Sequence, residues 1–293
     1  MSTVHVNQDE TGKPVELFYQ DIGAGRPVVL IHGWPLNHAM WEYQMLALSR
    51  QGYRVVAYDR RGFGQSSKPA GGYDYDTLAD DLKGLLDALD LQDAVLVGFS
   101  MGGGEVARYM GRHGGARVGK VAFISAVTPF LLKTEDNPDG VDASVFEQMV
   151  SGLEKDRFDF LASFGRTFYG VGMLKHPVSD ATMQWSQSLA WPASTRATID
   201  CVHAFGKTDF RNDLKNIRVP VLVIHGDGDD IVPLKVSGKR TAEMLPTAEY
   251  KVYSGAPHGL FITDKDELSR DLAAFAQGGA AQPAVKPEAQ QSQ

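Results

Sequence analysis

The sequence predicts an α/β fold, with a mostly parallel, doubly wound sheet, an antiparallel hairpin at the N-terminus and an inserted helical cap. Short apolar runs recur along the chain, each closed by glycine or a polar turn, and helical patterns lie between them. The runs are nearly continuous rather than alternating, which is typical of strands buried on both faces of a parallel sheet. The expected strands of this kind are Pro27–Ile31, Tyr53–Tyr58, Ala94–Phe99, Val118–Ser125 and Val219–His225. Ala248–Tyr253 is expected to be the last strand.

The clearest helical pattern begins at Tyr75 and ends near Leu89. Its apolar residues recur at spacings of three and four, as they do on the buried side of a surface helix. Asp74 or Asp76 could cap its start, because a short acidic side chain accepts hydrogen bonds from the first free amides and suits the helix dipole. Together with the apolar runs, this helix supports alternating strands and helices.

Two regions depart from that alternation. The N-terminal region predicts a hairpin with strands Thr3–Asn7 and Val15–Asp21 and a turn near Gly12. A later stretch is too long for one crossover helix and is rich in Phe, Met and Trp, which favours an inserted cap. The final residues are mostly Ala, Gln, Pro and Gly without periodicity. We therefore expect a core of residues 1–127 and 214–277, a helical cap of residues 128–213 and a disordered tail of residues 278–293.

Composition narrows the function classes. The formal net charge is −7, so the basic surface that nucleic-acid binding requires is not expected. Cys201 is the only cysteine, which excludes a disulfide within the chain and fits a reducing compartment. The N-terminus carries Asp9 and Glu10 without an apolar run, and no stretch is apolar enough to span a bilayer. We expect a cytoplasmic protein with no membrane partner.

A serine lies in a motif typical of a nucleophile. Residues 98–102 read Gly-Phe-Ser-Met-Gly, with an apolar run before them and the helical pattern Glu105–Met110 after them. In this G-x-S-x-G context Ser100 would occupy a sharp strand-to-helix turn, which needs small neighbours. The following helix would offer amides to developing negative charge. The alternative is a tight glycine turn that only packs a helix on a sheet.

A serine hydroxyl is a weak nucleophile until a base removes its proton, and this motif is followed in the chain by an acid and then a histidine. His258 follows the last expected strand on a loop with glycine and proline neighbours, and is the base we predict. The acid should follow the preceding strand, where a turn holds three carboxylates. We choose Asp229, with Asp227 as the closer rival, to orient the imidazole.

Two backbone amides are expected to form an oxyanion hole. One belongs to Met101, directly after the serine, and the other to Trp34, in the loop that follows the strand Pro27–Ile31. His32 and His225 are interpreted as structural residues. The remaining histidines share no metal-ligand spacing, so no metal or other cofactor is predicted.

Residues 59–66 read Asp-Arg-Arg-Gly-Phe-Gly-Gln-Ser after an apolar run. This polar loop could bind an anion. The preferred interpretation is a structural loop of buried ion pairs and backbone hydrogen bonds.

These motifs together resemble the cofactor-free bacterial haloperoxidases and their aryl esterase relatives, which have the α/β-hydrolase fold. The resemblance extends from about Val15 to Ala276 and rests most specifically on residues 97–109, Val-Gly-Phe-Ser-Met-Gly-Gly-Gly-Glu-Val-Ala-Arg-Tyr. It also covers residues 32–35, 58–64, 225–229 and 256–259. The resemblance places a catalytic triad on Ser100, Asp229 and His258, and oxyanion donors on Trp34 and Met101.

The resemblance implies two reactions at one site. Water attacking an acyl-enzyme gives ester hydrolysis, and hydrogen peroxide attacking it gives a peracid that oxidises halide in solution, without haem, vanadium or flavin. It also implies a homo-oligomer, often built from trimers. Relatives with more peroxide activity tend to carry a proline where this chain has Pro35. Because proline fixes its own φ and restricts the preceding residue, it could orient the Trp34 carbonyl toward peroxide.

An apolar pocket for small or aryl carboxylic esters is expected near the motifs. The residues expected to line it are Pro35, Val127, Phe164, Phe168, Ile231 and Val232. Other functions also fit the sequence: the protein could be a lactone, amide or carbon–carbon bond hydrolase, or a small-molecule receptor without turnover. Haloalkane dehalogenase chemistry is disfavoured because Ser100 stands where an aspartate would be needed.

Overall fold

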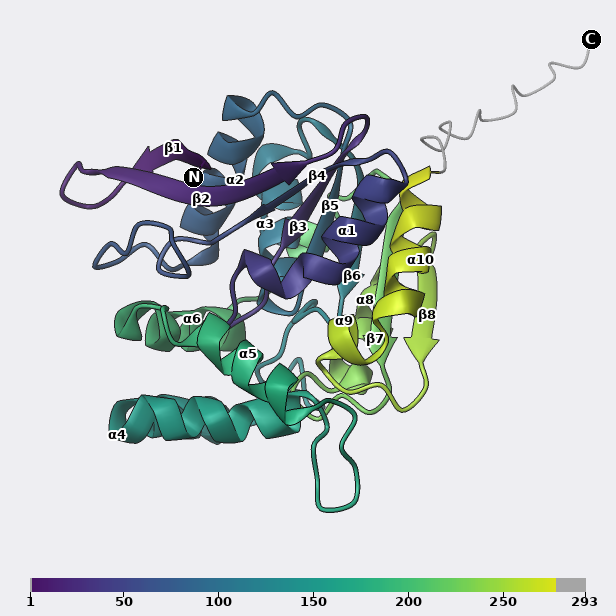
Figure 1. Cartoon of the computed structure of the whole chain (residues 1–293). Helices are drawn as coiled ribbons and strands as arrows, with labels where there is room; N and C mark the ends of the chain where they lie inside the picture. Colours follow the sequence, from purple (N-terminus) through teal and green to yellow (C-terminus); the bar gives the residue numbers. More distant parts are fainter. Residues whose placement is uncertain (1, 278–293) are drawn as a thin grey trace, which may run out of the picture.

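The computed structural model describes residues 2–277, and the tail predicted at residues 278–293 lies outside the described residues. Eight strands form one sheet in the order β1-β2-β4-β3-β5-β6-β7-β8 (Figure 1). The pairs β1/β2 and β2/β4 are antiparallel and the other pairs are parallel, which confirms the mostly parallel sheet with its N-terminal hairpin. The strands are β1 (Ser2–Gln8), β2 (Pro14–Ile22), β3 (Pro27–Ile31), β4 (Arg54–Tyr58), β5 (Ala94–Phe99), β6 (Val118–Ile124), β7 (Val221–Gly226) and β8 (Glu249–Tyr253).

The central strands are buried along their length, as their continuous apolar sequences predict. Their register brings their carboxyl ends to one edge of the sheet. Ile31 pairs with Gly98, Phe99 with Ile124, and Ile124 with Ile224. The loops that follow β3, β5, β6 and β7 therefore leave the sheet side by side, which is where sites form in open α/β sheets.

Helices cover both faces of the sheet, so the fold is doubly wound. Figure 1 shows α2 and α3 packed together on one face and α1 and α10 on the other. Asp74 is the residue that caps α2, where it accepts from the Thr77 amide, and Asp76 lies in the first turn. The helices of this layer are α1 (Glu42–Arg50), α2 (Tyr75–Ala88), α3 (Met101–His113), α8 (Gly238–Met244), α9 (Leu260–Thr263) and α10 (Lys265–Gln277).

An inserted helical region lies between β6 and β7, over the carboxyl edge of the sheet (Figure 1). Its longest helix consists of two segments that meet at Asp156, whose φ of −155° and ψ of 93° are not helical. The Asp156 carboxylate accepts from the Asp159 amide and so caps the second segment. The boundaries 128–213 stay a prediction. The helices are α4 (Ala143–Phe168), α5 (Asp180–Ala190), α6 (Thr195–Lys207) and α7 (Arg211–Leu214).

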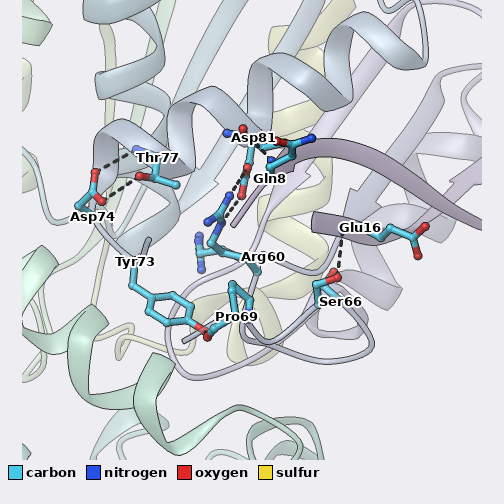
Figure 2. A network of polar contacts seen from close by, with 12 residues as sticks. Gln8, Glu16, Arg60, Ser66, Pro69, Tyr73, Asp74, Thr77 and Asp81 are labelled. Atoms are coloured by element: carbon cyan, nitrogen blue, oxygen red, sulfur yellow. Dashed lines mark hydrogen bonds and ion pairs between the residues drawn. The ribbon is translucent and has the colours of Figure 1, made fainter. Parts of the chain in front are cut away.

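The polar loop between β4 and α2 is built from buried ion pairs and hydrogen bonds, as its preferred interpretation predicts (Figure 2). Arg61 makes two 2.6 Å bonds to the Asp81 carboxylate on α2. The Tyr73 hydroxyl donates to the Pro69 carbonyl at 2.6 Å, which closes the end of the loop. Asp59 accepts from the amide and the ring Nδ1 of His38. These contacts hold the loop against the site edge of the sheet.

Within residues 2–277, no helix combines the length and the apolar character that crossing a bilayer requires.

Candidate active site

Ser100 occupies the turn between β5 and α3 in a conformation that few residues adopt. Its φ is 53° and its ψ is −119°, a strained geometry of the kind that costs about 1–3 kcal/mol. The turn is possible because the residues two positions before and two positions after Ser100 are glycines. A Cβ at Gly98 would lie 2.5 Å from the Gly102 carbonyl oxygen, and one at Gly102 would lie 2.5 Å from the Ile31 carbonyl oxygen. The strain places the Ser100 side chain at the carboxyl edge of the sheet.

His258 reaches Ser100 from the loop between β8 and α9. Its Nε2 lies 3.0 Å from Ser100 Oγ, although the two residues are 158 positions apart. Its Nδ1 lies 2.6 Å from Asp229 Oδ2 in the loop after β7. The structure thus brings together the three residues predicted from the motifs. A proton can pass from Ser100 to His258 over one hydrogen bond while the carboxylate balances the charge.

Each oxygen of Asp229 has its own donors. Oδ1 accepts from the amides of Ile231 and Val232 at 2.9 and 2.8 Å. Oδ2 faces His258, and the His225 Nε2 lies 3.3 Å from it. Burial alone would raise the pKa of Asp229, but the facing His258 and the hydrogen bonds from both imidazoles hold that pKa well below its usual range. Asp229 therefore stays ionised opposite the imidazole.

Asp227, the rival acid, has a different role. Its carboxylate accepts from the backbone amide of Gly255, in the loop that carries His258. It braces the loop without touching the imidazole.

Two contacts around His258 were not predicted from the sequence. The Phe168 ring meets the imidazole edge to face, with centroids 4.9 Å apart, and the Gly259 amide donates to the Phe168 carbonyl at 2.8 Å. The end of α4 is thereby fixed to the loop of the histidine. His225 donates from Nε2 to the Val232 carbonyl while approaching Asp229, so it supports the carboxylate as well as the loop. The only sequence signal for this was its position four residues before Asp229.

The amides of Trp34 and Met101 are free to bind a ligand. Neither donates a hydrogen bond to another group within residues 2–277. Met101 is the first residue of α3, and Trp34 lies on the loop after β3, where Gly33 passes so close that a Cβ there would lie 3.0 Å from Ser100 Cβ. The Trp34 side chain is anchored, since its Nε1 donates to the Thr198 carbonyl at 3.0 Å. The Trp34–Pro35 peptide bond is cis.

A cavity of about 460 Å³ lies beside Ser100 and His258. Its walls are largely apolar and come from the sheet edge and the inserted helices. The acyl group of a small ester could bind here with its carbonyl next to the serine, and so could the oxyanion that forms from this carbonyl. The other lining residues are Trp34, Leu131, Val141, Val145, Phe146, Met149, Phe164, Phe205, Ile231 and Val232.

The predicted pocket residues divide into three groups. Phe164, Ile231 and Val232 line the cavity beside Ser100. Pro35 and Phe168 instead line a second hollow of about 310 Å³, and Phe164 lines both spaces. Val127 lines neither, contrary to expectation. Its side chain is buried, and its amide donates to the Ser100 carbonyl at 3.2 Å, so it helps to hold the backbone of the serine in place.

Within the described residues, no group of three or more His, Cys, Asp and Glu side chains is placed to hold a metal ion. Cys201 is fully buried, and burial raises the pKa of its thiol to about 12. It behaves as a core residue rather than a reactive thiol.

Comparisons with known proteins show the family of this chain. The family described as the alpha/beta hydrolase fold matches residues 26–265. The non-heme chloroperoxidase CPO-A1 of Kitasatospora aureofaciens is 44% identical over 263 residues, which are 89% of this chain and 96% of that protein. The bifunctional esterase/perhydrolase DCH of Acinetobacter calcoaceticus is 41% identical over 266 residues, 89% of this chain and 96% of that protein.

A solved structure gives the same result. The bromoperoxidase of Bacillus anthracis superposes with a TM-score of 0.90 at 47% identity, covering 94% of this chain and 99% of that chain. Identity at this level over nearly the full length of the relatives is ample to assign the family. The chain belongs to the α/β-hydrolase superfamily and, within it, to the family of non-heme haloperoxidases and esterase/perhydrolases.

Proposed function

We propose that this enzyme hydrolyses small carboxylic esters through an acyl-enzyme on Ser100, and that hydrogen peroxide can replace water in the second step. His258 is the general base and acid, Asp229 orients it, and the amides of Trp34 and Met101 bind the oxyanion. The 3.0 Å contact between Ser100 Oγ and His258 Nε2, at a strained turn facing an apolar cavity, is the observation that carries this proposal.

The chemistry follows from these positions. Ser100 Oγ attacks the ester carbonyl carbon as His258 takes its proton, and the tetrahedral oxyanion lies against the two amides. The carbon–oxygen bond to the alcohol then breaks, and His258 returns the proton to the leaving oxygen. Water, activated by His258, releases the carboxylic acid and restores Ser100. Hydrogen peroxide in the same position releases a peracid, which oxidises bromide to hypobromite in solution and becomes the carboxylic acid.

Two assays test this proposal with the purified protein. The first follows turnover of 4-nitrophenyl acetate. The second follows bromination of monochlorodimedone in a mixture of peroxide, bromide and acetate. We expect turnover in both, with bromination requiring acetate because the oxidant is the peracid. A protein that binds ligands but turns over neither substrate would be a receptor on this fold. Bromination independent of any carboxylic acid would contradict the peracid route.

Replacing Pro35 is expected to change the balance between the two second steps. The Trp34 carbonyl accepts no hydrogen bond within residues 2–277, so it is free to receive one from peroxide. Proline restricts the backbone of Trp34, and leucine would release that restriction. Pro35→Leu should lower peracid formation relative to ester hydrolysis by up to about tenfold, the worth of one hydrogen bond. The ratio of the two rates is the measurement, and an unchanged ratio would contradict this role.

Phe164 is expected to set the size of acyl group that the enzyme accepts. It lines the cavity beside Ser100, the hollow of Pro35 and Phe168, and an outer groove of about 780 Å³. Phe164→Ala would join these spaces, so 4-nitrophenyl octanoate should gain at least about tenfold in kcat/KM relative to the acetate ester.

Phe160→Ala is the matched control, because Phe160 lines the outer groove but not the cavity beside Ser100. It should leave the preference nearly unchanged. Equal gains in the two variants would show that Phe164 does not determine which acyl group the enzyme prefers.

A cytoplasmic location and a trimer-based homo-oligomer stay predictions for this enzyme.

A further inference from the structure

Arg60, in the polar loop after β4, is buried deep inside the molecule. Only 1% of its surface is exposed, and Glu105, its partner on α3, is equally buried. Its Nε donates to Glu105 Oε2 at 2.7 Å, and the Tyr58 hydroxyl donates to the other carboxylate oxygen. A buried ion pair of this kind is weak evidence for stability, because removing two charges from water offsets their attraction. Stability alone therefore does not explain why the Arg60–Glu105 ion pair is buried here, which points to a functional role.

The same guanidinium has a second partner. Nη2 of Arg60 donates to the His32 carbonyl at 2.8 Å, and the Arg60 backbone amide donates to His32 Nε2 at 2.9 Å. The pKa of His32 is held well below its ordinary value, mainly by burial and secondly by the positive charge of Arg60. The imidazole therefore stays neutral, and Nε2 keeps its acceptor lone pair. His32 Nδ1 lies 2.9 Å from the Gly33 carbonyl, which fixes this tautomer. Arg60 is thus bonded to the loop after β3 at two points.

These two partners carry the two halves of the proposed oxyanion hole. Glu105 lies one turn along α3 from Met101, which supplies one amide. His32 precedes Trp34, which supplies the other, in a loop kept in shape by the Leu36 amide bonding to the Gly33 carbonyl. One rigid, planar group therefore connects the helix that holds the first donor to the loop that holds the second. Such donors work only when they lie within a few tenths of an ångström of the productive hydrogen-bond distance to the oxyanion, about 2.7–3.1 Å.

We propose that Arg60 is a positioning residue that sets the distance between the Trp34 and Met101 amides by tying α3 to the loop after β3. The inference rests on the proposed function of those amides. Figure 2 shows Arg60 among the polar contacts of its loop, which also reaches Asp81 on α2. The neighbouring arginine supplies the control: Arg61 is as buried as Arg60, but among residues 2–277 its guanidinium bonds to Asp81 alone and not to the oxyanion loop or α3.

The experiment compares Arg60→Lys with Arg61→Lys. A lysine can keep the charge beside Glu105, but its single ammonium cannot make the fixed two-sided contact with Glu105 and His32. We expect Arg60→Lys to lower kcat for 4-nitrophenyl acetate by about 10–100-fold, part of the loss seen when an oxyanion donor is removed outright. KM should change by less than about threefold. Arg61→Lys should lose similar thermal stability while its kcat stays within about twofold of the parent.

A second readout separates positioning from general damage. Phenylboronic acid forms a tetrahedral adduct with an active serine and so mimics the oxyanion. Its affinity should fall in Arg60→Lys by the same factor as kcat/KM. A merely structural role for Arg60 would lower the melting temperature and leave the ratio of boronate affinity to KM at its parent value.

Folding of Arg60→Lys is checked first by circular dichroism. If it does not fold, Arg60→Met combined with Glu105→Gln provides the same test, because it leaves no buried charge and the new amide still accepts from Tyr58. Equal kcat in the Arg60 and Arg61 variants, or undiminished boronate affinity, would overturn the proposal. Failure of the parent enzyme to turn over any ester would instead overturn the proposed function, so the two failures are distinguishable.

Discussion

Ser100→Ala is expected to abolish turnover of 4-nitrophenyl acetate and the peroxide-dependent bromination together. Both reactions use the same acyl-enzyme, and alanine removes the only atom that can form it. Loss of a serine nucleophile of this kind reduces kcat by about 10⁶-fold, which leaves only the contribution of the oxyanion hole and binding. Both rates of the variant should therefore fall to the background of the buffer.

Ser125→Ala is the matched control for this variant. Ser125 directly follows β6, also has a positive φ, and its buried Oγ has no hydrogen-bond partner among the described residues. Removing that hydroxyl should leave both activities within about twofold, since no contact in the structure depends on it. Bromination that survived in Ser100→Ala while esterase activity vanished would show that the two reactions do not share an intermediate.

Asp229→Asn is expected to lower kcat by about 10⁴-fold while the protein stays folded. The amides of Ile231 and Val232 require an acceptor at the Oδ1 position, so the new amide must direct its NH₂ group toward His258. An imidazole facing a donor at Nδ1 carries its proton on Nε2 and cannot accept the proton of Ser100. The variant therefore traps His258 in the wrong tautomer.

Asp227→Asn distinguishes this effect from general damage to the turn. Within the part of the chain that the structure describes, its carboxylate accepts only from the Gly255 amide, and an asparagine oxygen can accept that bond equally well. The expected loss in kcat is less than about tenfold. Losses of the same size in both variants would contradict the assignment of Asp229 as the residue that orients the histidine.

The sequence predicted the parts of this fold that depend on local pattern. Continuous apolar runs located the central strands, because burial on both faces leaves few polar positions in such a strand. Glycines around Ser100 identified the turn, since they are required wherever backbone atoms pass within 2.5 Å of a would-be Cβ. The order of serine, acid and histidine is the one known for this motif, and the expected strands then showed where the acid and the histidine should lie.

The choice between Asp227 and Asp229 could not be made from the sequence with the same security. Both carboxylates lie in one turn, and which of them faces His258 depends on side-chain directions that no periodicity encodes. Asp229 is selected by the amides of Ile231 and Val232, which pin one oxygen and aim the other at the imidazole.

The cavity was the least predictable feature. Its walls come from segments far apart in the chain, such as Trp34 after β3 and Phe205 on α6. Val127 lies three residues after the end of β6, the strand that pairs with β5, yet its side chain is buried in the core. Arg60 links its own loop to the loop that holds His32 and to Glu105 on α3. This contact between two loops and one helix could be found only in the folded structure.

The most direct test of the account is covalent labelling with diethyl 4-nitrophenyl phosphate, followed by peptide mapping by mass spectrometry. We expect one diethylphosphoryl group per chain, carried by Ser100 Oγ, with ester hydrolysis and bromination lost in proportion to labelling. An adduct on another residue, or an enzyme that keeps either activity when Ser100 is fully labelled, would contradict it.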